Sequence, residues 1–127
     1  MNMIQTGISG SESLHVDSFT TAKALGSGTL DVLATPAMVT LMEKTAWTSV
    51  AGYLDPGFST VGTKLQITHL RPTPVGKTVT CESEVIEADG RKLVFFIKVS
   101  DEKGLVGEGT HERFIVENEK FLFKANR

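Results

Sequence analysis

The fold is decided by residues 35–54, which read TPAMVTLMEKTAWTSVAGYL. Pro36 suits the first helical turn, where its missing N–H is not needed, and Gly52 and Pro56 mark the end of the pattern. Thr35 is a good N-cap residue, because its hydroxyl can accept a hydrogen bond from a free N–H of the first turn. The stretch therefore predicts one long helix that is capped at Thr35.

This helix is apolar or small on nearly every side, which is typical of a helix buried inside a domain. Its only charged residues are Glu43 and Lys44, and the long Lys44 side chain can reach water from the most polar face. Glu43 instead has Val39, Ala46 and Trp47 as helical neighbours. Such neighbours desolvate a carboxylate, which is costly unless the group is paired or used. Glu43 is therefore a candidate functional residue.

The rest of the chain is dominated by segments with the period-two pattern of strands. Asp89 and Gly90 form a strong signal for a tight hairpin, and Gly107 and Gly109 suggest a place where the helix comes close to the last strand. A first strand is predicted before the helix at 14–21, and a short extended piece at 29–34. The later strands are predicted at 60–71, 77–87, 92–100 and 105–117, and the tail as a short helix or a strand extension.

Composition predicts a single soluble domain over residues 1–127, with residues 1–12 as a poorly ordered lead-in. The 40% hydrophobic and 22% charged content is ordinary for a globular protein, and the net charge of −2 gives no basic surface for nucleic acid or an anionic membrane. No apolar run is long enough to span a bilayer, and the N-terminus lacks the regions of a signal peptide. The lone Cys81 permits no internal disulfide, so we expect a cytoplasmic protein.

A single apolar helix can be hidden by an antiparallel sheet that curves around it, with the outer face of the sheet partly solvated. This α+β arrangement is the hotdog fold. Its sheet leaves an open edge strand, which is commonly paired across a dimer axis. We therefore expect a homodimer or a larger homo-oligomer.

Three runs carry a resemblance to a known family: LATPAMVTLMEKTAW, GTKLQITHLRPTPVG and GEGTHERFIV. They resemble the fluoroacetyl-CoA thioesterase family of the hotdog superfamily over about three quarters of the chain. The resemblance implies a hydrolase that splits a small acyl-CoA thioester into free acid and CoA. No cofactor is expected, since CoA is part of the substrate, and the sequence contains no metal-ligand spacing.

The resemblance also implies roles for five residues. Thr35, Glu43 and His69 correspond to catalytic residues of the family, and the spacing of 26 positions between Glu43 and His69 agrees with it. Gly62 corresponds to a glycine whose N–H meets the thioester carbonyl, and Arg113 to an arginine near the acyl pocket. In this superfamily the site lies at a subunit interface.

From the residues alone, purely structural roles also remain open for Thr35, His69 and Glu43. Thr35 can be only a cap, and His69, on the inward face of its strand, can be a satisfied core residue. Glu43 can form a buried ion pair with Arg71 or Arg113. Three further residues receive no role: His15, His111 and Cys81.

The mechanism also stays open between two forms. Glu43 can act as a general base on water or as a direct nucleophile, while His69 positions the water or protonates the departing sulfur. The type member of the family closes its pocket with a phenylalanine on a lid before the helix, whereas residues 26–34, GSGTLDVLA, contain no aromatic residue. We therefore expect a broader or different small acyl group.

Two other function classes remain as alternatives. One is a non-catalytic acyl-CoA binding module, although Glu43 and His69 are both present as acid–base groups. The other is a different hotdog enzyme, such as an acyl-thioester hydratase, which typically relies on an Asp/His pair that we do not find in the expected context.

Overall fold

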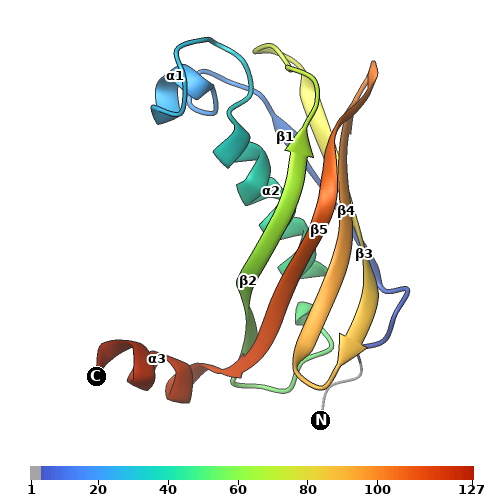
Figure 1. Ribbon diagram of the computed structural model, residues 1–127, viewed down its shortest axis with the longest axis vertical. Coiled ribbons are helices and arrows are strands. Elements are labelled where there is room, and N and C mark those ends of the chain that lie inside the picture. Colours follow the sequence, from blue (N-terminus) through green and yellow to red (C-terminus); the bar gives the residue numbers. More distant parts are fainter. Residues whose placement is uncertain (1–3) are drawn as a thin grey trace.

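The computed structural model describes residues 4–127 and contains one five-stranded antiparallel sheet curved around a central helix (Figure 1). The order of the strands in the sheet is β1-β3-β4-β5-β2, so β1 and β2 are its two edges. The strands are β1 (Ser9–His15), β2 (Phe58–His69), β3 (Thr78–Asp89), β4 (Lys92–Asp101) and β5 (Gly104–Glu117). The helices are α1 (Ala22–Leu25), α2 (Thr35–Ala51) and α3 (Asn118–Asn126).

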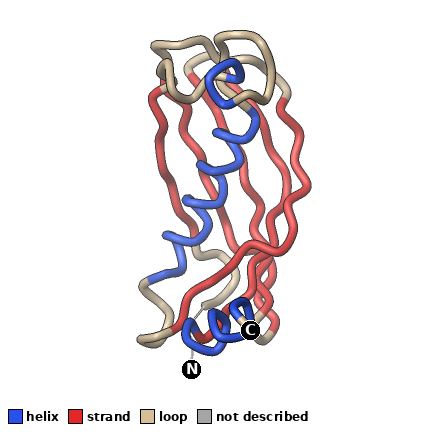
Figure 2. The backbone as a smooth tube through the Cα atoms, turned by 90° about the vertical axis from the view of Figure 1, so that its left-hand side faces the viewer, coloured by secondary structure: helices blue, strands red, loops and turns tan. Residues whose placement is uncertain are grey.

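The central helix is confirmed as α2, which runs along the concave face of the sheet (Figure 2). Its buried side chains pack against inward residues of the strands to form one core, which includes Met38, Met42, Val50, Phe95 and Ile97. A β-carbon added to Gly107 would lie 2.9 Å from the Met38 sulfur, so this glycine does let α2 come close to β5. Gly109 differs from the prediction, because its close neighbours belong to β2 and not to the helix.

The N-cap prediction was wrong. The cap residue of α2 is Ala34, and no side chain makes a capping hydrogen bond there. Thr35 is already the first helical residue, so its hydroxyl is free for another partner. Thr35 thereby loses its purely structural explanation.

The first strand also lies earlier than predicted. It spans Ser9–His15 rather than 14–21. It therefore begins inside residues 1–12, which were expected to be a poorly ordered lead-in; residues 1–3 of that segment lie outside the described part. Gly10 packs so closely on α2 that an added β-carbon would lie 2.6 Å from that of Ser49. The predicted extended piece at 29–34 forms only isolated bridges, and α1, which was not predicted, precedes it. The tail forms the helix α3.

None of the helices in residues 4–127 is long and apolar enough to cross a membrane. The same residues contain no cluster of His, Cys, Asp and Glu side chains that would hold a metal ion.

Candidate active site

The first part of the site is formed where α2 begins and β2 ends. Thr35 is the first residue of α2 and His69 the last of β2, and the Thr35 hydroxyl oxygen lies 2.8 Å from Nδ1 of the imidazole. Burial lowers the pKa of His69, and the nearby backbone of Arg71 opposes part of that effect. His69 is therefore neutral near pH 7. Its Nε2 is buried and has no hydrogen-bond partner among the described residues.

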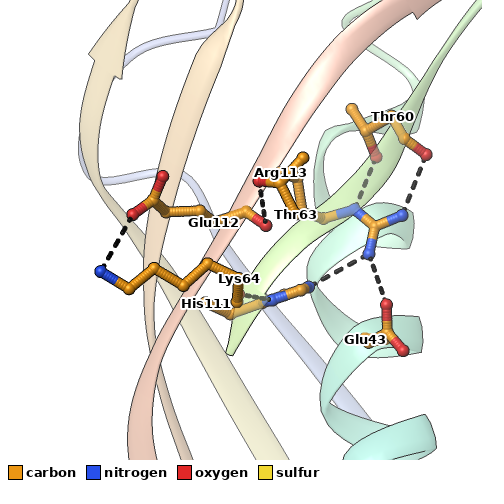
Figure 3. A network of polar contacts seen from close by, with 7 residues as sticks. All are labelled: Glu43, Thr60, Thr63, Lys64, His111, Glu112 and Arg113. Carbon is orange, nitrogen blue, oxygen red and sulfur yellow. Dashed lines mark hydrogen bonds and ion pairs between the residues drawn. The ribbon is translucent and has the colours of Figure 1, made fainter. Parts of the chain in front are cut away.

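The second part is the ion pair between Glu43 and Arg113 (Figure 3), in which Nη1 of the guanidinium lies 3.2 Å from Oε2 of the carboxylate. The rest of the guanidinium is held by Thr60, whose hydroxyl accepts from Nε at 2.8 Å and whose carbonyl accepts from Nη2 at 2.9 Å. The Arg113 side chain is only 7% exposed, whereas that of Glu43 is 44% exposed. A rigid cation thus holds one side of a carboxylate that stays open to solvent on the other.

These contacts correct the expected surroundings of Glu43 and decide its partner. The carboxylate faces Arg113 rather than an apolar shell. The other candidate partner, Arg71, instead pairs with the buried carboxylate of Asp101, which also accepts from Thr73.

His111 belongs to this second cluster, although it received no role from the sequence. Its Nδ1 lies 2.8 Å from the Lys64 carbonyl and its Nε2 lies 3.1 Å from Nη1 of Arg113 (Figure 3). A carbonyl only accepts and a guanidinium only donates, so Nδ1 carries the proton and Nε2 is an acceptor. His111 is therefore neutral and fixed in one tautomer, and it helps to orient Arg113 toward Glu43.

Gly62 leaves the space that the Glu43 carboxylate occupies. A β-carbon at Gly62 would lie 2.6 Å from Oε2 of Glu43 and 3.3 Å from Nη1 of Arg113. Gly62 is paired with Arg113, and the register between β2 and β5 shifts directly after it. Such a bulge turns backbone and side chains away from the regular pleat.

The five predicted site residues form two groups that lie apart. One is the pair of Thr35 and His69, and the other is the pair of Glu43 and Arg113, with Gly62 beside it. Thr35 and Glu43 are eight residues apart on α2, which corresponds to about 12 Å along the helix axis. Gly62 and His69 are seven residues apart on β2, or about 23 Å along the strand. Within one chain, Glu43 and the Thr35–His69 pair are therefore not in contact.

Each pair borders its own cavity. A cavity of about 410 Å³ lies beside Arg113 and is lined by Trp47, Phe58 and Thr60 among others. A second cavity, of about 260 Å³, lies beside Thr35 and His69. A ligand in these cavities can therefore contact Arg113 in one pair and Thr35 and His69 in the other.

Comparisons with known proteins establish the family and the fold. A family model described as fluoroacetyl-CoA-specific thioesterase matches residues 16–119. The chain belongs to this family. It is 39% identical over 97 residues to the fluoroacetyl-CoA thioesterase of Streptantibioticus cattleyicolor, which covers 76% of this chain and 70% of that protein. The predicted resemblance is thereby confirmed, and so is the enzyme class it implied, a thioester hydrolase.

Solved structures confirm the hotdog fold. A crystal structure of a fluoroacetyl-CoA thioesterase superposes with a TM-score of 0.92 at 32% identity, covering 97% of this chain and 96% of that one. A hot-dog-like protein from Thermanaerovibrio acidaminovorans gives a TM-score of 0.88 at 23% identity, covering 96% and 90%. At this lower identity the likeness concerns the fold alone.

Proposed function

We propose that this protein hydrolyses the thioester of a small acyl-CoA to the free acid and CoA, and that Glu43 is the catalytic carboxylate, acting on the attacking water or directly on the carbonyl carbon. The observation that carries the proposal is the half-open Glu43 carboxylate, fixed by a buried arginine beside a cavity. Family membership supports the substrate class, since solved relatives include a variant with acetyl-CoA and another with fluoroacetate and CoA.

Arg113 holds the Glu43 carboxylate in a fixed orientation, as either chemical role requires. As a general base, Glu43 takes a proton from the water that attacks the carbonyl carbon. As a nucleophile, it forms an acyl anhydride that water then cleaves. In both forms the carbon–sulfur bond breaks and the CoA thiolate takes up a proton, while the Gly62 N–H stabilises the carbonyl oxygen as it becomes negative.

A second copy of the chain completes the site in this proposal. The β2 strand is an open edge of 12 residues, and Trp47, on the neighbouring helix, is 46% exposed. Long open edges and large exposed aromatic side chains both favour association. Antiparallel pairing of β2 with β2, centred between Leu65 and Gln66, sets His69 of one strand opposite Gly62 of the other. The Thr35–His69 pair of one subunit thereby approaches Glu43 of the other.

In this arrangement His69 meets the substrate at the cavity that it borders together with Thr35. The neutral imidazole can protonate the departing sulfur or hold the attacking water, and the Thr35 hydroxyl fixes the orientation of the ring through Nδ1. The acyl group is small but need not be fluoroacetyl, since residues 26–34, directly before α2, present Leu30, 68% exposed, and contain no aromatic side chain.

The activity is tested by measuring the release of free CoA thiol from a panel of acyl-CoAs of increasing length and from fluoroacetyl-CoA. We expect turnover of at least one short acyl-CoA, and the preferred acyl group defines the substrate. Binding of acyl-CoA without turnover of any member would replace the proposal with the binding-module alternative.

The shared site is tested by mixing two inactive variants, Glu43→Gln and His69→Asn, and allowing their subunits to exchange. A mixed dimer has one site with both substitutions and one with neither. If the site is shared, an equimolar mixture recovers about a quarter of the wild-type activity. If each chain supplies its own complete site, the mixture stays inactive.

A further inference from the structure

A groove rich in cations lies between α3 and the end of the sheet. It has a volume of about 170 Å³ and is lined by Arg91, Val116, Glu117, Lys120, Phe121 and Lys124. We call it the α3 groove. Figure 1 shows α3 standing off from the end of β5, at the end of the molecule where α2 finishes. Three of the six lining residues are positively charged and one is negatively charged.

Two of these cations are not neutralised by the protein. Across residues 4–127, Arg91 and Lys124 have no ion pair with a carboxylate, whereas most other cations do. Lys120 pairs with Glu117 only at 3.7 Å, and its side chain is 78% exposed. Positive charge is therefore concentrated here in a chain whose net charge is −2.

The α3 groove adjoins the cavity beside Arg113. The two share the contact between Arg91 and Phe58, in which the guanidinium carbon lies 5.9 Å from the centre of the ring. Phe58 also lines the cavity beside Arg113. From Arg113 to Glu117, β5 covers four residues, or about 13 Å. An elongated ligand can thus extend from Glu43 past Trp47 and Phe58 to the α3 groove.

We propose that the α3 groove binds the 3′-phosphorylated ADP of the CoA substrate, a proposal that rests on the proposed function. The phosphates carry several negative charges, which suit the fork of Arg91 and the flexible ammonium groups of Lys120 and Lys124. Phe121 is 41% exposed and offers a ring face on which the adenine can stack. The uncharged pantetheine arm then lies along the cavity beside Arg113, with its thioester toward Glu43.

The test compares an acyl-CoA with the same acyl group on pantetheine, which lacks the nucleotide. For the double variant Arg91→Ala/Lys124→Ala, we expect the KM of the acyl-CoA to rise about tenfold, with kcat unchanged and with both constants for acyl-pantetheine unchanged. The control is Lys98→Ala/Lys103→Ala, which removes the same charge outside the groove and should change neither substrate's KM. The salt dependence of kcat/KM for the acyl-CoA should also weaken in the first variant only.

An unchanged KM for acyl-CoA in the groove variant, or equal losses with both substrates, would overturn the proposal. If the wild type hydrolyses neither thioester, the proposed function fails, and titration with CoA decides the groove separately. Weaker CoA binding by the groove variant than by the control variant would still support nucleotide binding in the α3 groove, and equal binding would refute it.

Discussion

The Thr35 hydroxyl lies 2.8 Å from Nδ1 of His69 and makes no capping bond to its own helix. The hydroxyl thus does not make the N-cap hydrogen bond that a threonine at the start of a helix commonly makes. We predict that Thr35→Val lowers kcat about tenfold through the lost hydrogen bond, whereas Thr35→Ser keeps most of the activity. The free energy of unfolding should change by less than about 0.5 kcal/mol in both variants, against about 1 kcal/mol for a lost cap. A Thr35→Val enzyme that is destabilised but fully active would contradict this role.

Gly62 should be required for activity more than for folding. A β-carbon there would displace the end of the Glu43 side chain, which can move without disturbing the core. Gly62→Ala should therefore fold but lose at least about tenfold in kcat. Gly52→Ala is the matched control, because Gly52 has helical dihedral angles and open space around it. Equal kcat values for the two variants would show that Gly62 does not set the position of Glu43.

His111 should act through hydrogen bonds rather than through its volume. His111→Leu leaves the Lys64 carbonyl and one Arg113 N–H without their partner, which we expect to cost about 1–3 kcal/mol of unfolding free energy. His111→Gln can offer a donor and an acceptor and should recover part of both stability and kcat. Urea unfolding and steady-state kinetics measure the two effects. Equal behaviour of the two variants would mean that His111 only fills space.

Stability should fall on mild acidification because burial lowers the pKa of both His69 and His111. In the unfolded chain both imidazoles take up a proton near their ordinary pKa of about 6.5, whereas in the folded chain they do so only at lower pH. Stability is thus complete above about pH 6.5 and decreases below it. Thermal unfolding from about pH 8 to about pH 5 should show this slope, and the double variant His69→Asn/His111→Gln should reduce it. An unchanged slope would mean that other groups cause it.

A second loss should follow in stronger acid. Burial alone would raise the pKa of Asp101, but hydrogen bonds from the Arg71 guanidinium and two further donors leave it below its ordinary value. The stability that this carboxylate contributes is present above about pH 4 and is lost as the pH falls further.

Much of the fold could be predicted from residue periodicity, because α2 and the later strands have strong apolar patterns. The β1 strand could not, since Ser9–His15 is mostly small and polar and owes its place to pairing with β3 and to the close contact of Gly10 with α2. The cap at Thr35 was predicted wrongly because its hydroxyl bonds to His69, a partner 34 positions away.

The site was only partly visible in the sequence. The choice of Arg113 over Arg71 as the partner of Glu43 depends on how β2 and β5 pair, which no local pattern reveals. His111 was missed for the same reason. Its only sequence signal is the H-x-R spacing, which puts His111 and Arg113 on the same face of β5.

The most direct test of the central claim is steady-state release of CoA thiol by Glu43→Gln, with the wild type measured on its best acyl-CoA. Gln keeps the shape of the side chain and can still accept from Arg113, but it cannot act as a base or a carboxylate nucleophile. We predict that kcat falls at least about a hundredfold, or about 2.7 kcal/mol, while the thermal stability stays close to that of the wild type. A variant that keeps kcat within about threefold of the wild type would contradict the assignment of Glu43 as the catalytic carboxylate.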